Sequence, residues 1–71
     1  MEAVVDARGL MCPEPVLLTR RELQRLKKGK VRVIVDAAAA RDNVTRLAQH
    51  EGWRVSVREE GNTWLLILEK D

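Results

Sequence analysis

The 71-residue sequence is poor in the residues that build several kinds of functional site. It contains one cysteine, which excludes an intrachain disulfide and dithiol redox chemistry. It also contains one histidine, so no cluster of cysteine and histidine stands at metal-ligand spacing, and we expect neither a metal nor a cofactor. Phenylalanine and tyrosine are absent and only two tryptophans occur, which leaves little aromatic surface for stacking on nucleic-acid bases.

Long apolar runs are also absent. The longest covers residues 64–68, far short of the roughly 20 residues that a membrane-spanning helix needs. The first residues, Met1-Glu2-Ala3, do not resemble the start of a signal peptide. We therefore expect a cytoplasmic protein without a membrane partner.

The composition is 45% apolar and 34% charged, which is typical of a folded, water-soluble protein. A chain of this length forms one compact domain, residues 1–71, whose small core leaves no space for a roomy internal pocket. Any chemistry is therefore expected at an exposed residue, with the rest of the site supplied by a partner. The formal charge of +2 makes no strong case for a nucleic-acid partner.

The spacing of apolar residues predicts the element order βαβαββ. The predicted strands are residues 3–6, 30–36, 53–58 and 63–69, and the predicted helices are residues 13–28 and 37–51. A strand, helix and strand in sequence imply right-handed crossovers between parallel strands, whereas the closing hairpin adds an antiparallel pair. We therefore predict an α/β fold, more closely an α+β two-layer sandwich, with both helices on one face of a four-stranded mixed sheet.

The last predicted strand is apolar on both sides, although two helices can cover only one face of the sheet. Either Leu65 and Ile67 or the alternate residues must then face outward, near Ile34. This open face is interpreted as a partner surface, a dimer contact or the seat of a second domain. The alternative is a few surface aliphatic residues of no function.

Cys12 is the candidate reactive residue, because it lies between a glycine-containing turn and the start of the first predicted helix. Pro13 is expected at the first helical position, where proline is favoured, and Pro15 falls in the first turn. The positive end of the helix dipole would stabilise a thiolate or a persulfide anion at Cys12. A buried cysteine that acts only as a small hydrophobic residue is the alternative.

Charged residues near Cys12 act in opposite directions. Glu14 is a negative charge that opposes formation of a thiolate. Arg8 is the nearest cation in sequence, and Arg41 can join it if the two helices begin side by side. We therefore expect an exposed thiol that is only modestly activated.

The segment DARGLMCPEP, residues 6–15, closely resembles the signature of the TusA/SirA-like family of bacterial sulfur carriers. The residues that stand at the family's spacing are Asp6, Gly9, Cys12, Pro13 and Pro15. The resemblance extends along essentially the whole chain. Where tRNA-thiolation carriers have Asp-Pro-Ala, residues 36–44 read DAAAARDNV, which looks more like the amino-terminal domain of YedF-type members associated with selenium metabolism.

The resemblance implies a βαβαββ sandwich in which Cys12 accepts sulfur as a persulfide. The implied donor is a cysteine desulfurase or a similar protein, and the sulfur would pass to a second protein that acts as acceptor. Pro13 and Pro15 would shape the loop, and Asp6 and Gly9 would fix the turn that presents it. The remaining residues implied or expected near the thiol are Arg8, Glu14, Arg41 and Asp42.

Two functions of other classes remain open. Basic residues cluster along and just after the first predicted helix, as in a nucleic-acid-binding module, although such residues are commonly a solvated face or a docking surface for an acidic partner. They are Arg20, Arg21, Arg25, Lys27, Lys28 and Lys30. Alternatively, the chain is a regulatory interaction domain in which Cys12 is vestigial. The apolar residues expected to be exposed around the thiol would serve a partner under either function, and they are Leu10, Met11, Leu17 and Leu18. Trp53 and Trp64 are interpreted as a cross-strand pair in the hairpin.

Overall fold

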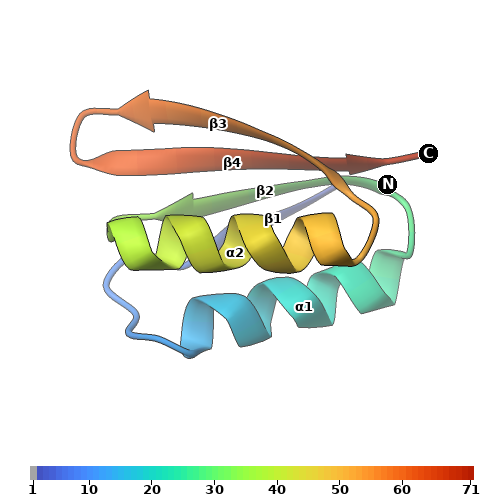
Figure 1. Cartoon of the computed structure of the whole chain (residues 1–71), viewed down its shortest axis with the longest axis horizontal. Helices are drawn as coiled ribbons and strands as arrows, with labels where there is room; N and C mark the ends of the chain where they lie inside the picture. The colour runs from blue at the N-terminus through green and yellow to red at the C-terminus, as the bar shows by residue number, and fades with distance from the viewer. Residues whose placement is uncertain (1) are drawn as a thin grey trace.

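The computed structural model describes residues 2–71, and its elements follow one another in the predicted order βαβαββ. The strands are β1 (Glu2–Asp6), β2 (Gly29–Val35), β3 (Arg54–Glu60) and β4 (Thr63–Lys70), and the helices are α1 (Glu14–Leu26) and α2 (Ala38–His50). Both helices lie side by side on one face of the sheet (Figure 1). The predicted two-layer sandwich is therefore confirmed.

The sheet has the strand order β1-β2-β4-β3. β1 pairs with β2 in parallel, and β4 is antiparallel to both of its neighbours, β2 and β3. The predicted mixed sheet is therefore correct, and β2 and β4 are its two central strands. Within residues 2–71, neither helix is long and apolar enough to cross a membrane.

The core lies between the sheet and the helices. Its fully buried side chains come mainly from alternate positions of the central strands, with further contributions from the inner faces of both helices. They include Val31, Val33, Val35, Leu66, Leu68, Val44 and Ala48. Thr19 is buried among them, and its hydroxyl donates to the carbonyl of Pro15 at 2.8 Å. This core holds the starts of the two helices in fixed positions relative to the sheet.

The register of β4 decides which of its residues face outward. Leu66 lies opposite Val33 of β2, and both are fully buried beneath the helices. Leu65 and Ile67 therefore belong to the open face, where Leu65 lies opposite Ile34. The apolar open face inferred from the sequence is thus present, and these two residues of β4 line it.

Two local expectations were wrong. Pro13 caps α1 instead of occupying its first turn, because its carbonyl already accepts the first helical hydrogen bond, from Leu17 N–H at 3.0 Å. The two tryptophans do not pair, since the hairpin turn sets Glu60 opposite Thr63 and so brings Glu59 opposite Trp64. Trp53 instead precedes β3 at the far end of the hairpin and is 4% exposed in the core.

Candidate functional site

Cys12 lies in the loop that joins β1 to α1, and its side chain is exposed. This loop leaves the carboxyl end of β1 at the same end of the molecule at which both helices begin (Figure 1). In open α/β sheets, crevices at the carboxyl ends of parallel strands are the usual position of functional sites. The amino-terminal ends of two helix dipoles therefore lie at the end of the molecule that carries the thiol.

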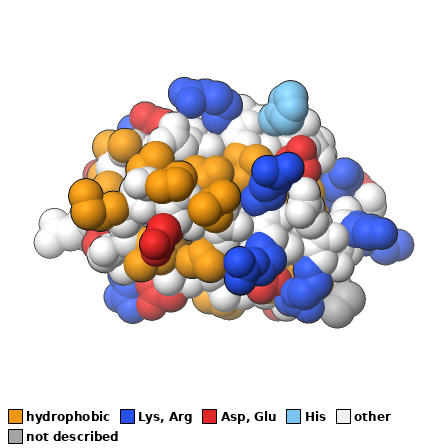
Figure 2. Space-filling view, turned by 90° about the horizontal axis from the view of Figure 1, so that it is seen from below, with side chains coloured by type: hydrophobic (Ala, Val, Ile, Leu, Met, Phe, Trp, Pro, Cys, Tyr) orange, Lys and Arg blue, Asp and Glu red, His pale blue; other side chains and the backbone are white. Residues whose placement is uncertain are grey.

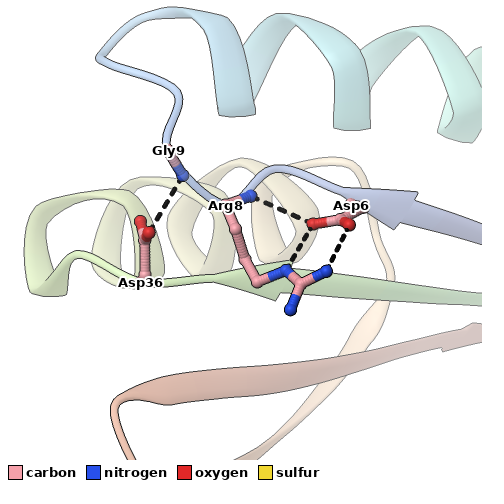
Figure 3. Close-up of polar contacts among 4 residues, drawn as sticks. All are labelled: Asp6, Arg8, Gly9 and Asp36. Carbon is pink, nitrogen blue, oxygen red and sulfur yellow. Dashed lines mark hydrogen bonds and ion pairs between the residues drawn. The ribbon is translucent and has the colours of Figure 1, made fainter.

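Two carboxylates brace the loop (Figure 3). Arg8 donates to Asp6 through its backbone N–H at 3.2 Å and through its guanidinium at 2.9 and 2.8 Å. Gly9 N–H donates to the carboxylate of Asp36 at 2.9 Å, which ties the loop to the residue that follows β2. Gly9 has φ of +76°, a conformation that favours glycine over residues with a Cβ. The predicted turn residues Asp6 and Gly9 do lie in this braced turn.

The pairing with Arg8 controls the charge of Asp6. Hydrogen bonds from the Arg8 side chain and backbone lower the pKa of Asp6 from 3.8 to about 2, so this carboxylate is ionised at neutral pH. The same side-chain hydrogen bond raises the pKa of Arg8 above its ordinary value. The guanidinium of Arg8 is thus engaged by Asp6, on the open face of the sheet, whereas the sequence suggested it as a cation for Cys12.

Arg41 and Asp42 are also engaged with other groups. The Arg41 side chain donates to Asp42 at 2.8 Å, which lowers the pKa of Asp42 and raises that of Arg41. The Arg41 guanidinium also lies over the ring of Trp64, 4.9 Å from its centroid, in a cation–π contact with β4. Both residues belong to the first turns of α2, as expected, and Arg41 directs its guanidinium to Asp42 and Trp64.

Asn43 makes the contact with the sulfur that the sequence did not reveal. Its side-chain amide donates to Cys12 Sγ at 3.7 Å across the junction between α1 and α2. Arg46 donates to Asn43 Oδ1 at 3.3 Å, and this contact directs the NH₂ group of the amide toward the sulfur. The available signals were the spacing of Asn43 and Arg46, three residues apart on one helix face, and the expected proximity of the two helix starts.

Large apolar side chains are exposed close to Cys12 in the sequence. Met11 is 81% exposed and Leu17 is 52% exposed, although both are large and apolar. A shallow pocket of about 230 Å³ lies against the first turns of α1, and its lining residues are Glu14, Leu17, Leu18 and Arg21. Seen from the helix side, hydrophobic side chains gather on one half of the molecule, and several Lys and Arg side chains occupy the other half (Figure 2). An exposed apolar surface of this kind is typical of a protein-binding site.

Comparisons with a family model and with individual proteins point to the same family. A sequence model of the family described as Sulfurtransferase TusA matches residues 3–70. A putative sulfur carrier protein of Methanocaldococcus jannaschii is 34% identical, with 93% of this chain and 89% of that protein covered. Sulfur carrier protein TusA of Pseudomonas paraeruginosa is 31% identical, with 99% and 91% covered.

A solved structure supports the same fold. The crystal structure of the SirA-like protein from Desulfitobacterium hafniense superposes with a TM-score of 0.88. The two sequences are 26% identical, and the match covers 94% of this chain and 95% of that one. The βαβαββ sandwich is therefore shared over nearly the whole length of both chains.

Proposed function

Because the chain belongs to the TusA family of sulfurtransferases and sulfur carriers, we propose that Cys12 carries sulfur as a persulfide between two proteins. The donor is a protein of the cysteine desulfurase type, and the acceptor is a second protein with a nucleophilic group. The observation that supports this role most directly is the position of the one cysteine. Cys12 is exposed where both helices begin, and it accepts a hydrogen bond from Asn43.

Each transfer is an exchange at sulfur and needs no external oxidant. The thiolate of Cys12 attacks the outer sulfur of the donor's persulfide, so an S–S bond forms at Cys12 and the donor's S–S bond breaks. The donor's cysteine leaves as a thiolate. In the second step the acceptor's nucleophile attacks the outer sulfur on Cys12, and Cys12 leaves as a thiolate, ready for another cycle.

The surroundings of Cys12 suit an anionic sulfur. The Asn43 amide supplies a donor whose direction is fixed by Arg46, and the helix starts contribute partial positive charge. Pro13 and Pro15 set the path of the chain on either side of Glu14, and neither has an N–H group to offer. Donors to the sulfur must therefore come largely from outside the loop, which is the role we assign to Asn43.

Transfer between proteins also requires a surface on which donor and acceptor dock. The exposed side chains of Met11 and Leu17 provide apolar area within a few residues of Cys12. A partner bound there would cover the thiol and exclude water during the exchange. The same surface would serve a regulatory interaction domain, so the exposed apolar residues alone do not separate the two functions, and the chemistry at Cys12 must.

The test is the intact mass of the protein after incubation with a cysteine desulfurase and free cysteine. We expect a gain of about 32 Da, one sulfur atom, that disappears on addition of reductant. Cys12→Ser is the control and should gain nothing while it keeps the same circular dichroism spectrum. If the wild-type protein stays unmodified with several donors, or if Cys12→Ser gains the same mass, the carrier function is refuted and the interaction-domain function is favoured.

A further inference from the structure

The face of the sheet opposite the helices carries a regular pattern of side chains. Both helices cover the other face, so these residues have no covering element among residues 2–71 (Figure 1). Strand register arranges them in three cross-strand rows, each of which runs from β1 through β2 and β4 to β3. The rows are Asp6, Ile34, Leu65 and Arg58; Val4, Arg32, Ile67 and Ser56; and Glu2, Lys30, Glu69 and Arg54.

The charges in these rows separate by strand. The β1 edge contributes the acidic residues Glu2 and Asp6, and the β3 edge contributes the basic residues Arg54 and Arg58. The two central strands mix apolar and charged residues on this face, with the half-buried apolar side chains Ile34, Leu65 and Ile67 beside the charged residues Arg32, Lys30 and Glu69. Val4, on the β1 edge, is 63% exposed. Within these rows the face therefore has an acidic edge and a basic edge, with a middle that mixes apolar and charged side chains. Beyond the rows, Arg8 pairs with Asp6 at the acidic edge, and Glu60 follows Arg58 on the same side of β3.

From this pattern we infer that the open face binds the same face of a second copy of the chain. A two-fold axis that lies between the sheets and runs parallel to the strands places β1 of each copy over β3 of the other, and β2 over β4. Glu2 then meets Arg54 of the second copy, and Asp6 meets Arg58. Aligned sheets pack about 10 Å apart with their strands within about 30° of one another, a distance that these side chains can span.

A second two-fold axis would also stack the two open faces, but the charges favour the axis parallel to the strands. A two-fold axis perpendicular to the strands would place β1 over β1 and β3 over β3, in opposite directions. Glu2 would then meet Asp6, and Arg54 would meet Arg58, so every edge contact would join like charges. In the selected arrangement the contacts in the middle are Ile34 with Leu65, Lys30 with Glu69, and Arg32 with Ile67, so two of the three join groups of matching chemistry.

The pairs already made within one chain do not prevent this exchange. Glu2 lies 3.5 Å from Arg32, and Arg54 lies 3.2 Å from Asp71. Asp6 and Lys30 are also paired within the chain, with Arg8 at 2.8 Å and with Glu69 at 4.0 Å. Arg32, Lys30 and Glu69 are partly exposed, whereas the other side chains of these pairs are more than half exposed. Exposed pairs of this kind contribute little, because solvent screens them and the long side chains lose freedom. Their charges are therefore available to a second copy.

The size of the face sets the strength of the contact. Four strands and three rows span about 20 Å in each direction, roughly 400 Å² for each copy. This is smaller than a standard stable interface, so the dimer is weak and forms at high protein concentration. The segment that joins β1 to α1 and carries Cys12 lies on the helix side of the sheet (Figure 1), so the exposed thiol stays accessible in the dimer and this inference stands independently of the proposed sulfur transfer.

Charge reversal tests the arrangement. Glu2→Lys and Arg54→Glu each place like charges together at both symmetric edge contacts of a dimer, and each should raise its dissociation constant about tenfold or more. An equimolar mixture of the two variants restores opposite charges at both contacts of a mixed dimer, so the mixture should associate as tightly as wild type. The measurement is sedimentation equilibrium of the full chain up to millimolar concentration.

Arg20→Glu on α1 is the matched control for Arg54→Glu, since it makes the same change of charge on the helix side and should leave the dissociation constant unchanged. Recovery in the mixture shows that neither variant is misfolded, and circular dichroism of each variant checks this separately. The inference is overturned if wild type is monomeric at millimolar concentration, in which case the face serves another protein or domain. It is equally overturned if the single variants associate like wild type, or if their mixture associates no more tightly than either alone.

Discussion

Replacing Asn43 should slow the loading of sulfur onto Cys12. The amide is half-buried and its hydrogen bond to Sγ is long, at 3.7 Å. A hydrogen bond to a charged group contributes about 1.5–3 kcal/mol, and partial exposure and this length reduce the value here to about 1 kcal/mol. Asn43→Ala should therefore lower the rate of persulfide formation about fivefold. Asn43→Asp should lower it further, because a carboxylate repels the sulfur anion.

The assay follows the mass of the Cys12 persulfide over time with a fixed concentration of cysteine desulfurase. A parallel measurement, alkylation of Cys12 by iodoacetamide, reports on the thiolate without any docking partner and should decline in the same order. Asn62→Asp, in the exposed β3–β4 turn, makes the same chemical change away from the sulfur and should leave both rates unaltered. The reasoning is refuted if Asn43→Asp loads sulfur as fast as wild type, or if Asn62→Asp is slowed equally.

Three further predictions concern stability. Gly9→Ala should destabilise the fold by about 1–2 kcal/mol, because its φ of +76° disfavours a Cβ, and thermal unfolding measures this; an unchanged midpoint would contradict it. Asp6, with a pKa lowered from 3.8 to about 2, should contribute stability above pH 3.8 that is lost as pH falls through about 2. The free energy of unfolding of Asp6→Asn, measured with urea, should lack this pH-dependent contribution. A pH dependence equal to that of wild type would contradict the pairing of Asp6 with Arg8. Leu66→Ala should cost about 2–5 kcal/mol in the same assay, and Leu65→Ala less, because only Leu66 is fully buried.

Helices and strands with a regular spacing of apolar residues could be predicted from the sequence. β2 is the best example, because its valines occupy alternate positions and each lies on the buried face, as expected. β4 is apolar at every central position, so local pattern could not say which side faces the helices, and pairing with β2 decides it. The predicted pairing of Trp53 with Trp64 was wrong for a related reason. The position of the turn fixes which residues lie opposite each other in a hairpin, and the local pattern does not specify that position.

The site divides in the same way. The loop, the exposed thiol and the turn residues follow from a short contiguous segment, because proline and glycine constrain the backbone where they stand. The contact between Asn43 and Cys12 depends on how closely α2 packs beside α1, which no local pattern specifies. Position in the sequence and at the helix starts suggests Arg8 and Arg41 as cations for the thiol, but each pairs with a carboxylate, Arg8 with Asp6 and Arg41 with Asp42.

The hydrogen bond from Gly9 to Asp36 has a consequence for motion. Asp36 stands at the junction between β2 and α2, two residues before α2 begins, so the cysteine-bearing loop is fastened to the segment that positions Asn43. Segments joined in this way open to solvent together as one cooperative unit. Amide exchange at Gly9 would then keep pace with exchange at the first hydrogen-bonded amide of α2, that of Arg41, which donates to the carbonyl of Ala37. Local opening would consequently move Cys12 and the Asn43 amide at the same time.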